Sequence, residues 1–104
     1  MTGQVAIITG GGRGLGKAFA LALADKGMHV VVTSRSKSEL QNTVQMIKDR
    51  EGEASYRVAD VTNQEETQQV IGTVETEIGP IELLINNAGS LRAIKPVSEV
   101  DAEV

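Results

Sequence analysis

The sequence has no cysteine, one histidine and very few aromatic side chains, which make up 2% of its 104 residues. The lack of cysteine excludes disulfides and thiolate metal sites, and it suits a reducing compartment. No apolar run approaches the ~20 residues that a membrane-spanning helix requires. No secretion signal is recognisable at the N-terminus. We therefore expect a cytoplasmic protein with an aliphatic core and no membrane partner.

The charge balance is mildly acidic, with a formal net charge of -4 at pH 7. A negative surface repels polyanions, so nucleic acid is not an expected partner. The length suffices for one modest domain.

Short apolar runs alternate with amphipathic segments along the chain. Strands are expected at Val5–Thr9, His29–Thr33, Ala54–Ala59 and Ile81–Asn86, and helices at Gly14–Lys26, Lys37–Arg50 and Gln64–Glu77. Gly27 and Gly52 are expected to end the first two helices. Strand–helix alternation with short loops predicts an α/β fold with parallel strands. The first, second and fourth strands are almost wholly aliphatic, as in a sheet covered on both faces, whereas the third is mixed and suits an edge.

A glycine-rich turn, Thr9-Gly10-Gly11-Gly12-Arg13-Gly14-Leu15-Gly16, joins the first strand to the first helix. Such a turn directs free backbone N–H groups and the positive end of a helix dipole toward one point. Glycines allow a diphosphate to approach the backbone closely. The turn therefore predicts a nucleotide site.

Three blocks in this order resemble the short-chain dehydrogenase/reductase family. The first is Thr-Gly-x-x-x-Gly-x-Gly, formed by Thr9, Gly10, Gly14 and Gly16; the others are Asp60-Val61 and Asn86-Asn87-Ala88-Gly89. The resemblance covers the whole chain, but only the N-terminal half of such a protein. It implies a Rossmann-type, doubly wound parallel sheet with strand order 3-2-1-4, of which residues 1–104 form the incomplete NAD(P)-binding part.

The blocks fall at the carboxyl ends of the expected strands, where open parallel sheets bind ligands. Gly14 and Gly16 would meet the pyrophosphate, and Leu15 would offer its backbone N–H while its side chain packs inward. Asp60 would accept a hydrogen bond from the adenine amino group. The full set of predicted cofactor-binding residues is Gly10, Gly12, Arg13, Gly14, Leu15, Gly16, Ser34, Arg35, Lys37, Asp60, Val61, Asn87, Ala88 and Gly89.

The residues after the second strand favour NADP(H), with NAD(H) as the alternative. An NAD site usually has an acidic residue there to hold the ribose hydroxyls, whereas this chain has Thr33-Ser34-Arg35. Arg35 suits a 2′-phosphate through a charge-assisted contact. Arg13 and Lys37 add positive charge to the same region.

The resemblance implies hydride transfer between a nicotinamide and a carbonyl or alcohol carbon, in a homo-oligomer. The family's catalytic Ser, Tyr and Lys would lie beyond Val104, so no catalytic residue is assigned and this chain alone is expected to be inactive. The family pairs its Tyr with a Lys four residues later, but Asp60 stands four residues after Tyr56, so a packing role is expected for Tyr56. A structural role is likewise expected for His29.

The end of the sequence indicates part of a larger domain. The residues from Ser98 look like the start of a helix, with only six residues after Ser98. The fourth strand has the apolar sequence of an interior strand, although it would lie at an exposed edge. One alternative is a stand-alone, non-catalytic nucleotide-binding module. A phosphate-binding loop of NTPases is disfavoured, because Ala18 stands where that motif needs a Ser or Thr to hold Mg²⁺.

Overall fold

Four strands and three helices alternate in the computed structural model, which describes residues 4–10, 14–60 and 62–86. The strands are β1 (Val5–Thr9), β2 (His29–Ser34), β3 (Glu53–Val58) and β4 (Ile81–Asn86), and the helices are α1 (Gly14–Asp25), α2 (Lys37–Asp49) and α3 (Gln64–Glu77). Every strand and helix predicted between residues 5 and 86 is therefore present, with bounds that differ by one residue at most. No helix in these ranges is long and apolar enough to cross a membrane.

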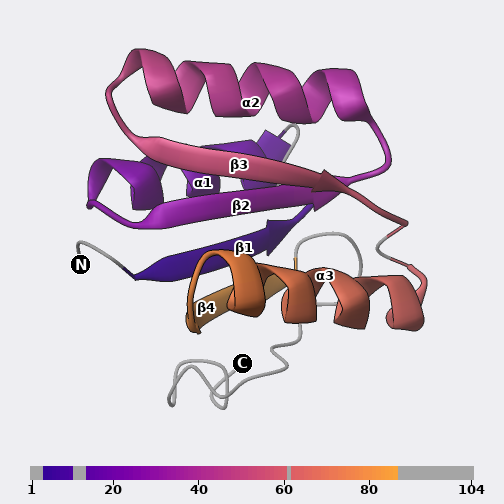
Figure 1. Cartoon of the computed structure of the whole chain (residues 1–104). Helices are drawn as coiled ribbons and strands as arrows, with labels where there is room; N and C mark the ends of the chain where they lie inside the picture. Colours follow the sequence, from indigo (N-terminus) through magenta and orange to yellow (C-terminus); the bar gives the residue numbers. More distant parts are fainter. Residues whose placement is uncertain (1–3, 11–13, 61, 87–104) are drawn as a thin grey trace, which may run out of the picture.

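The strands form one parallel sheet in the order β3-β2-β1-β4, which confirms the predicted Rossmann-type topology. Helices α1 and α2 cover one face of the sheet and α3 covers the other (Figure 1). Successive side chains of a strand point to opposite faces. The central strands β1 and β2 are thus buried on both sides, which explains their continuous aliphatic sequences.

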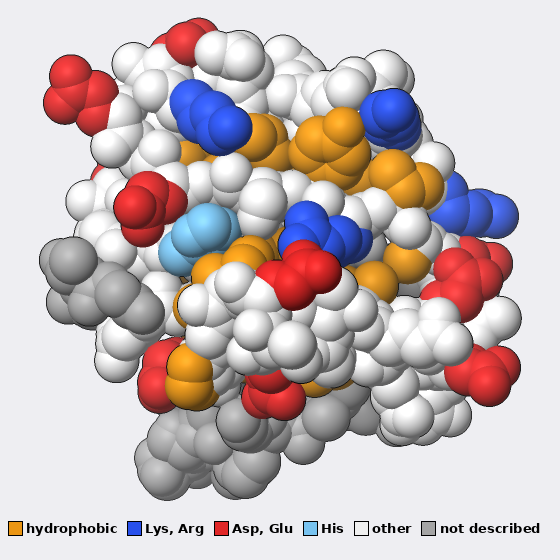
Figure 2. All heavy atoms as spheres, viewed as in Figure 1, with side chains coloured by type: hydrophobic (Ala, Val, Ile, Leu, Met, Phe, Trp, Pro, Cys, Tyr) orange, Lys and Arg blue, Asp and Glu red, His pale blue; other side chains and the backbone are white. Residues whose placement is uncertain are grey.

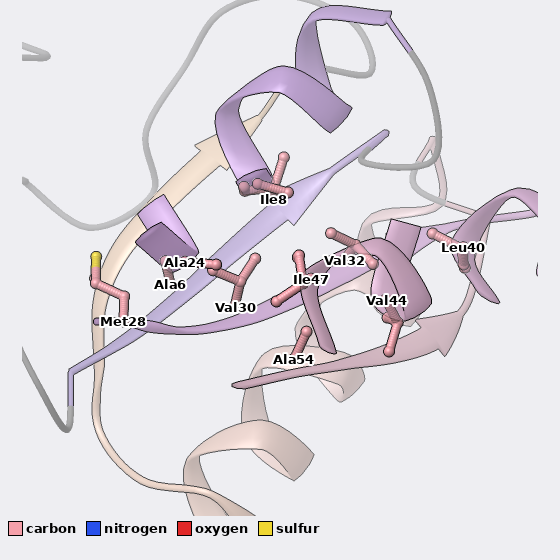
Figure 3. Close-up of a cluster of buried hydrophobic side chains, with 11 residues drawn as sticks. Ala6, Ile8, Ala24, Met28, Val30, Val32, Leu40, Val44, Ile47 and Ala54 are labelled. Atoms are coloured by element: carbon pink, nitrogen blue, oxygen red, sulfur yellow. The ribbon is translucent and has the colours of Figure 1, made fainter. Parts of the chain in front are cut away.

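Two aliphatic clusters hold these layers together. The larger lies between the sheet and helices α1 and α2, and Figure 3 shows Val30 and Val32 of β2 beside Ile47 and Val44 of α2. The smaller lies under α3, where Val74 is fully buried against the sheet. On α1 the buried residues are Gly16, Ala20 and Ala24, small side chains at four-residue intervals that let this helix lie close to the sheet.

The end of α2 differs from the prediction in one respect. The helix does end before Gly52, but Glu51 is the residue in the left-handed conformation, with φ of 64°. The backbone N–H of Gly52 donates to the carbonyl of Ile47 at 2.9 Å, and that of Glu51 donates to Lys48 at 2.9 Å, the pair of bonds of a Schellman motif. A Cβ at position 52 would lie 2.8 Å from Cγ2 of Ile47, so Gly52 is required by close packing.

Candidate nucleotide-binding edge of the sheet

The carboxyl ends of all four strands lie along one side of the sheet, termed here the carboxyl edge (Figure 1). The register pairs Thr9 with both Thr33 and Asn86, and pairs Ser34 with Val58. The segments that follow β1, β2 and β3 therefore leave the sheet side by side. This arrangement brings together the described members of the predicted site, which are Gly10, Gly14, Leu15, Gly16, Ser34, Arg35, Lys37 and Asp60.

The glycines that flank the first turn have the backbone that this turn requires. Gly10 and Gly14 have φ of 70° and 61°, a left-handed region that is costly for side-chain-bearing residues. The N–H of Gly10 donates to the carbonyl of Thr33 at 2.7 Å, which extends the β1–β2 pairing by one bond. A Cβ built at Gly14 would meet no atom of the described residues within 4 Å, so none of them crowds the start of α1. The first turn of α1 contains no acidic side chain that would repel an anion there.

The inward packing predicted for Leu15 is wrong. Its side chain is 62% exposed, and Phe19, one helical turn later, is 37% exposed. The physical reason is the helix period: Gly16, Ala20 and Ala24 form the stripe that faces the sheet, so Leu15 and Phe19 fall on a neighbouring stripe.

Past β2, two serines organise the chain and leave two cations exposed. The Oγ of Ser34 accepts a hydrogen bond from the backbone N–H of Ser36 at 3.2 Å, and the Oγ of Ser36 accepts one from Glu39 N–H at 3.4 Å, which caps α2. Arg35 and Lys37 are exposed on either side of this cap. The turn therefore presents two positive side chains at the carboxyl edge.

Past β3, Asp60 is held by its neighbours. Its Oδ1 accepts hydrogen bonds from the backbone N–H and the hydroxyl of Thr62, at 3.0 and 2.6 Å. These bonds, chiefly the one from the hydroxyl, and more weakly the positive charge of Arg35, lower the pKa of Asp60 below its ordinary value. Asp60 is therefore an ionised acceptor at neutral pH, and the Arg35 after β2 is near enough to influence it.

Other predicted residues lie outside the described ranges. They are Gly12, Arg13, Val61, Asn87, Ala88 and Gly89, together with the helix start expected at Ser98.

The one histidine and the one tyrosine are not among the predicted site residues at the carboxyl edge. His29 begins β2 at the opposite end of the sheet, where its Nε2 lies 3.1 Å from the Oγ of Ser55. Tyr56 packs against the larger cluster, and its hydroxyl accepts a hydrogen bond from Nε2 of Gln41 at 3.1 Å. Both have the structural surroundings that were predicted. Within the described ranges no three His, Cys, Asp or Glu side chains gather as they would around a metal ion.

The sequence analysis overlooked Thr62 and Glu66, which contact Asp60. The Oε1 of Glu66 accepts a hydrogen bond from the backbone N–H of Asp60 at 2.9 Å. Asn63, the cap of α3, accepts from Glu66 N–H at 3.1 Å through Oδ1. An Asn followed three residues later by a Glu is a variant of the capping box, which signals the start of α3 but not the contact between Glu66 and Asp60.

Comparison with known proteins agrees with this fold. The short chain dehydrogenase family matches residues 4–104. A short-chain dehydrogenase/reductase homolog of Bacillus subtilis, YusS, is 39% identical over 100 residues, which cover 95% of this chain and 91% of that protein. The chain therefore belongs to the short-chain dehydrogenase/reductase family.

Two further relatives indicate how the chain compares in length. A 3-oxoacyl-[acyl-carrier-protein] reductase of Synechocystis is 44% identical over 93 residues, which cover 88% of this chain and 38% of that protein. A metagenomic short-chain oxidoreductase solved in complex with NADP has a TM-score of 0.82 and 33% identity, over 86% of this chain and 41% of that one. Apart from the Bacillus relative, the chain spans 30% to 40% of the curated relatives compared.

Proposed function

We propose that this chain is the cofactor-binding part of an NADP(H)-dependent oxidoreductase. The whole protein would transfer a hydride between the nicotinamide and a carbonyl or alcohol carbon of a small substrate. Family membership and the position of the glycine turn support this role. When bound, the dinucleotide would supply or accept the hydride. The residues of this chain would bind and orient it, with the catalytic groups outside residues 1–104.

The proposed site fits a dinucleotide in its chemistry. Among the described residues nothing crowds Gly14, and the first turn of α1 has no acidic side chain, which suits a diphosphate. Ionised Asp60 offers an acceptor to the adenine amino group. From the sequence alone, we add Gly12 and Arg13 to the phosphate side, Val61 to the adenine, and Asn87, Ala88 and Gly89 to the adenosine ribose and its surroundings.

The observation that carries the cofactor preference is the turn after β2. Ser34 ends the strand, exposed Arg35 follows it, and Thr33-Ser34-Arg35 has no acidic residue where an NAD site usually has one. A hydrogen bond to a charged group is worth about 1.5–3 kcal/mol, so two cationic contacts to a 2′-phosphate would favour NADPH over NADH by roughly a hundredfold. The similar metagenomic oxidoreductase, solved in complex with NADP, supports the same cofactor preference.

The experiment is a titration of the chain with NADPH and with NADH, followed by nucleotide fluorescence. Arg35→Asp should weaken NADPH binding by about a hundredfold and leave NADH binding unchanged or stronger. Arg50→Asp is the matched control, because it makes the same charge change on an exposed residue at the far end of α2. Equal losses of NADPH and NADH in Arg35→Asp would contradict the NADP assignment.

One observation favours a second candidate, a stand-alone nucleotide-binding module without reductase chemistry. The chain spans 91% of the Bacillus relative, which is therefore of similar length. The intact mass of the protein captured from its native source separates the two candidates. A mass well above 11.0 kDa supports the oxidoreductase, whereas a mass of 11.0 kDa supports the module.

We also infer a cytoplasmic location and a homo-oligomeric assembly. Family membership supports the assembly, and the absence of cysteine suits the reducing cytoplasm. The net charge of -4 does not favour nucleic acid as a partner.

A further inference from the structure

Asp60 is fastened to the start of α3 by four hydrogen bonds. Its backbone N–H donates to Oε1 of Glu66 at 2.9 Å, and its carbonyl accepts from Asn63 N–H at 2.9 Å. Its carboxylate Oδ1 accepts both bonds from Thr62. The backbone on both sides of the residue and one carboxylate oxygen are thereby fixed, so the orientation of the carboxyl plane is determined before any ligand arrives.

The two oxygens of this carboxylate differ in what they can still bind. Oδ1 holds two donors from Thr62, at 3.0 and 2.6 Å. Oδ2 has no hydrogen-bond partner in the part of the chain that the structure describes, and an ionised carboxylate oxygen only accepts. Oδ2 is thus the atom of Asp60 that is left for an N–H donor of a ligand.

We propose that Thr62 and Glu66 are positioning residues that aim Oδ2 of Asp60 at the 6-amino group of the cofactor's adenine. The inference rests on the proposed function, and it assigns to these two side chains the selection of adenine over bases without that group. Neither side chain touches the nucleotide in this arrangement. Thr62 sets the rotation of the carboxylate through its hydroxyl, and Glu66 sets the backbone position of Asp60.

The contacts at the start of α3 support these separate roles of Thr62 and Glu66. Glu66 is only partly exposed, and its own N–H is anchored on Asn63 Oδ1 at 3.1 Å. The Glu66 side chain therefore extends from an anchored backbone to the N–H of Asp60. Loss of one orienting bond would let the carboxylate or the backbone sample other positions, and the entropic cost of ordering it would then be met when the ligand binds.

The test compares NADPH with its hypoxanthine analogue, which carries a carbonyl oxygen in place of the 6-amino group. The parent chain should bind NADPH at least ten times more tightly than the analogue, since the amino group donates to a charged acceptor. Thr62→Val removes the hydroxyl without changing the shape of the side chain. It should weaken NADPH binding roughly fivefold and leave binding of the analogue unchanged.

Conservative variants separate positioning from folding. Thr62→Ser retains a hydroxyl and Glu66→Gln retains an acceptor oxygen, so both should keep the preference for NADPH, whereas Glu66→Ala should reduce it as Thr62→Val does. Equal weakening of both nucleotides in Thr62→Val would overturn the proposal, because it would indicate a general structural role. A parent chain that binds both nucleotides equally would also overturn it. A parent chain that binds neither would instead refute the proposed function itself.

Discussion

Thr9 and Thr33 lie opposite each other in the neighbouring strands β1 and β2, and they differ in the hydrogen bonding of their hydroxyl groups. The two residues are 3% and 2% exposed. The Oγ1 of Thr9 donates to the carbonyl of Ile85 at 3.4 Å, whereas the buried Oγ1 of Thr33 has no hydrogen-bond partner within the described part of the chain. A buried hydroxyl without a partner lowers stability, because it has lost its hydrogen bonds to water.

This pair yields a matched prediction for stability. Thr33→Val removes an unsatisfied hydroxyl at nearly constant volume and should raise the free energy of unfolding by about 1 kcal/mol. Thr9→Val should lower it by about the same amount, because the carbonyl of Ile85 loses a donor. Urea unfolding measures both. Equal destabilisation by the two substitutions would show that the Thr33 hydroxyl is in fact hydrogen-bonded.

A second prediction concerns the end of α2, where Glu51 has the left-handed backbone and Gly52 does not. Glu51→Gly should raise the free energy of unfolding by about 0.5–1 kcal/mol, since a left-handed backbone costs an L residue about 1–2 kcal/mol and glycine gives back part of this gain as entropy. Gly52→Ala should lower it by about 1–3 kcal/mol, because the new methyl group would press on buried Ile47. Equilibrium unfolding in urea again measures both. A neutral Gly52→Ala would mean that Ile47 moves aside freely.

The sequence predicted the parts of the fold that depend on local chemistry. Apolar runs end where the strands end, and the predicted helix starts Lys37 and Gln64 are those of α2 and α3. The carboxyl-edge site followed from topology, because parallel strands bring their carboxyl ends together. This is why distant segments around Gly10, Arg35 and Asp60 could be grouped without coordinates.

The sequence did not predict features that depend on contacts between elements. Leu15 has an apolar side chain in an amphipathic helix, and only the position of the sheet decides that Gly16 faces inward instead. The left-handed backbone lies at Glu51, while Gly52 packs closely against Ile47, a contact that has no local signature in the sequence. The anchoring of Asp60 by Glu66 likewise depends on how α3 begins relative to β3.

A third prediction follows from the pKa of His29, which is lowered from the ordinary value of 6.5. Burial is the main cause; Arg57 and Lys48 act in the same direction, and Glu53 opposes them. The unfolded chain therefore takes up the proton more readily than the folded one. The stability that neutral His29 contributes is complete above pH 6.5 and is lost as the pH falls from there through the folded pKa.

The measurement is the free energy of unfolding of the parent and of His29→Asn at several values between pH 7.5 and pH 5. The chain has one histidine, so the difference between the two proteins isolates this group. The parent should lose stability on acidification more steeply than His29→Asn. Parallel pH profiles would mean that His29 has the same pKa in the folded and unfolded chains.

The final prediction concerns the free edge of β3, which Arg57 protects. The backbone N–H of Ala59 donates to the carbonyl of Ser34 in β2. The backbone groups of Arg57 and Ala59 therefore point toward β2, and the carbonyl of Tyr56 points away from it. The Nη1 of Arg57 donates to that carbonyl at 2.8 Å, and its Nη2 pairs with Glu77 of α3 at 2.8 Å. A charged side chain over an edge carbonyl blocks the addition of another strand. Figure 2 shows the molecule from the same side as Figure 1, where charged side chains of both signs are interspersed with hydrophobic ones.

Arg57→Ala should therefore increase self-association, measured by sedimentation velocity over a range of protein concentrations. Arg50→Ala is the control, because Arg50 forms a similar ion pair with Asp25 at 2.6 Å that does not cover a strand edge. Both pairs are partly exposed to solvent, so each substitution should change the free energy of unfolding by less than about 1 kcal/mol. A shift toward larger species in Arg57→Ala alone supports edge protection. Unchanged sedimentation in Arg57→Ala, or an equal shift in Arg50→Ala, would refute it, since the loss of any surface ion pair would then have the same effect.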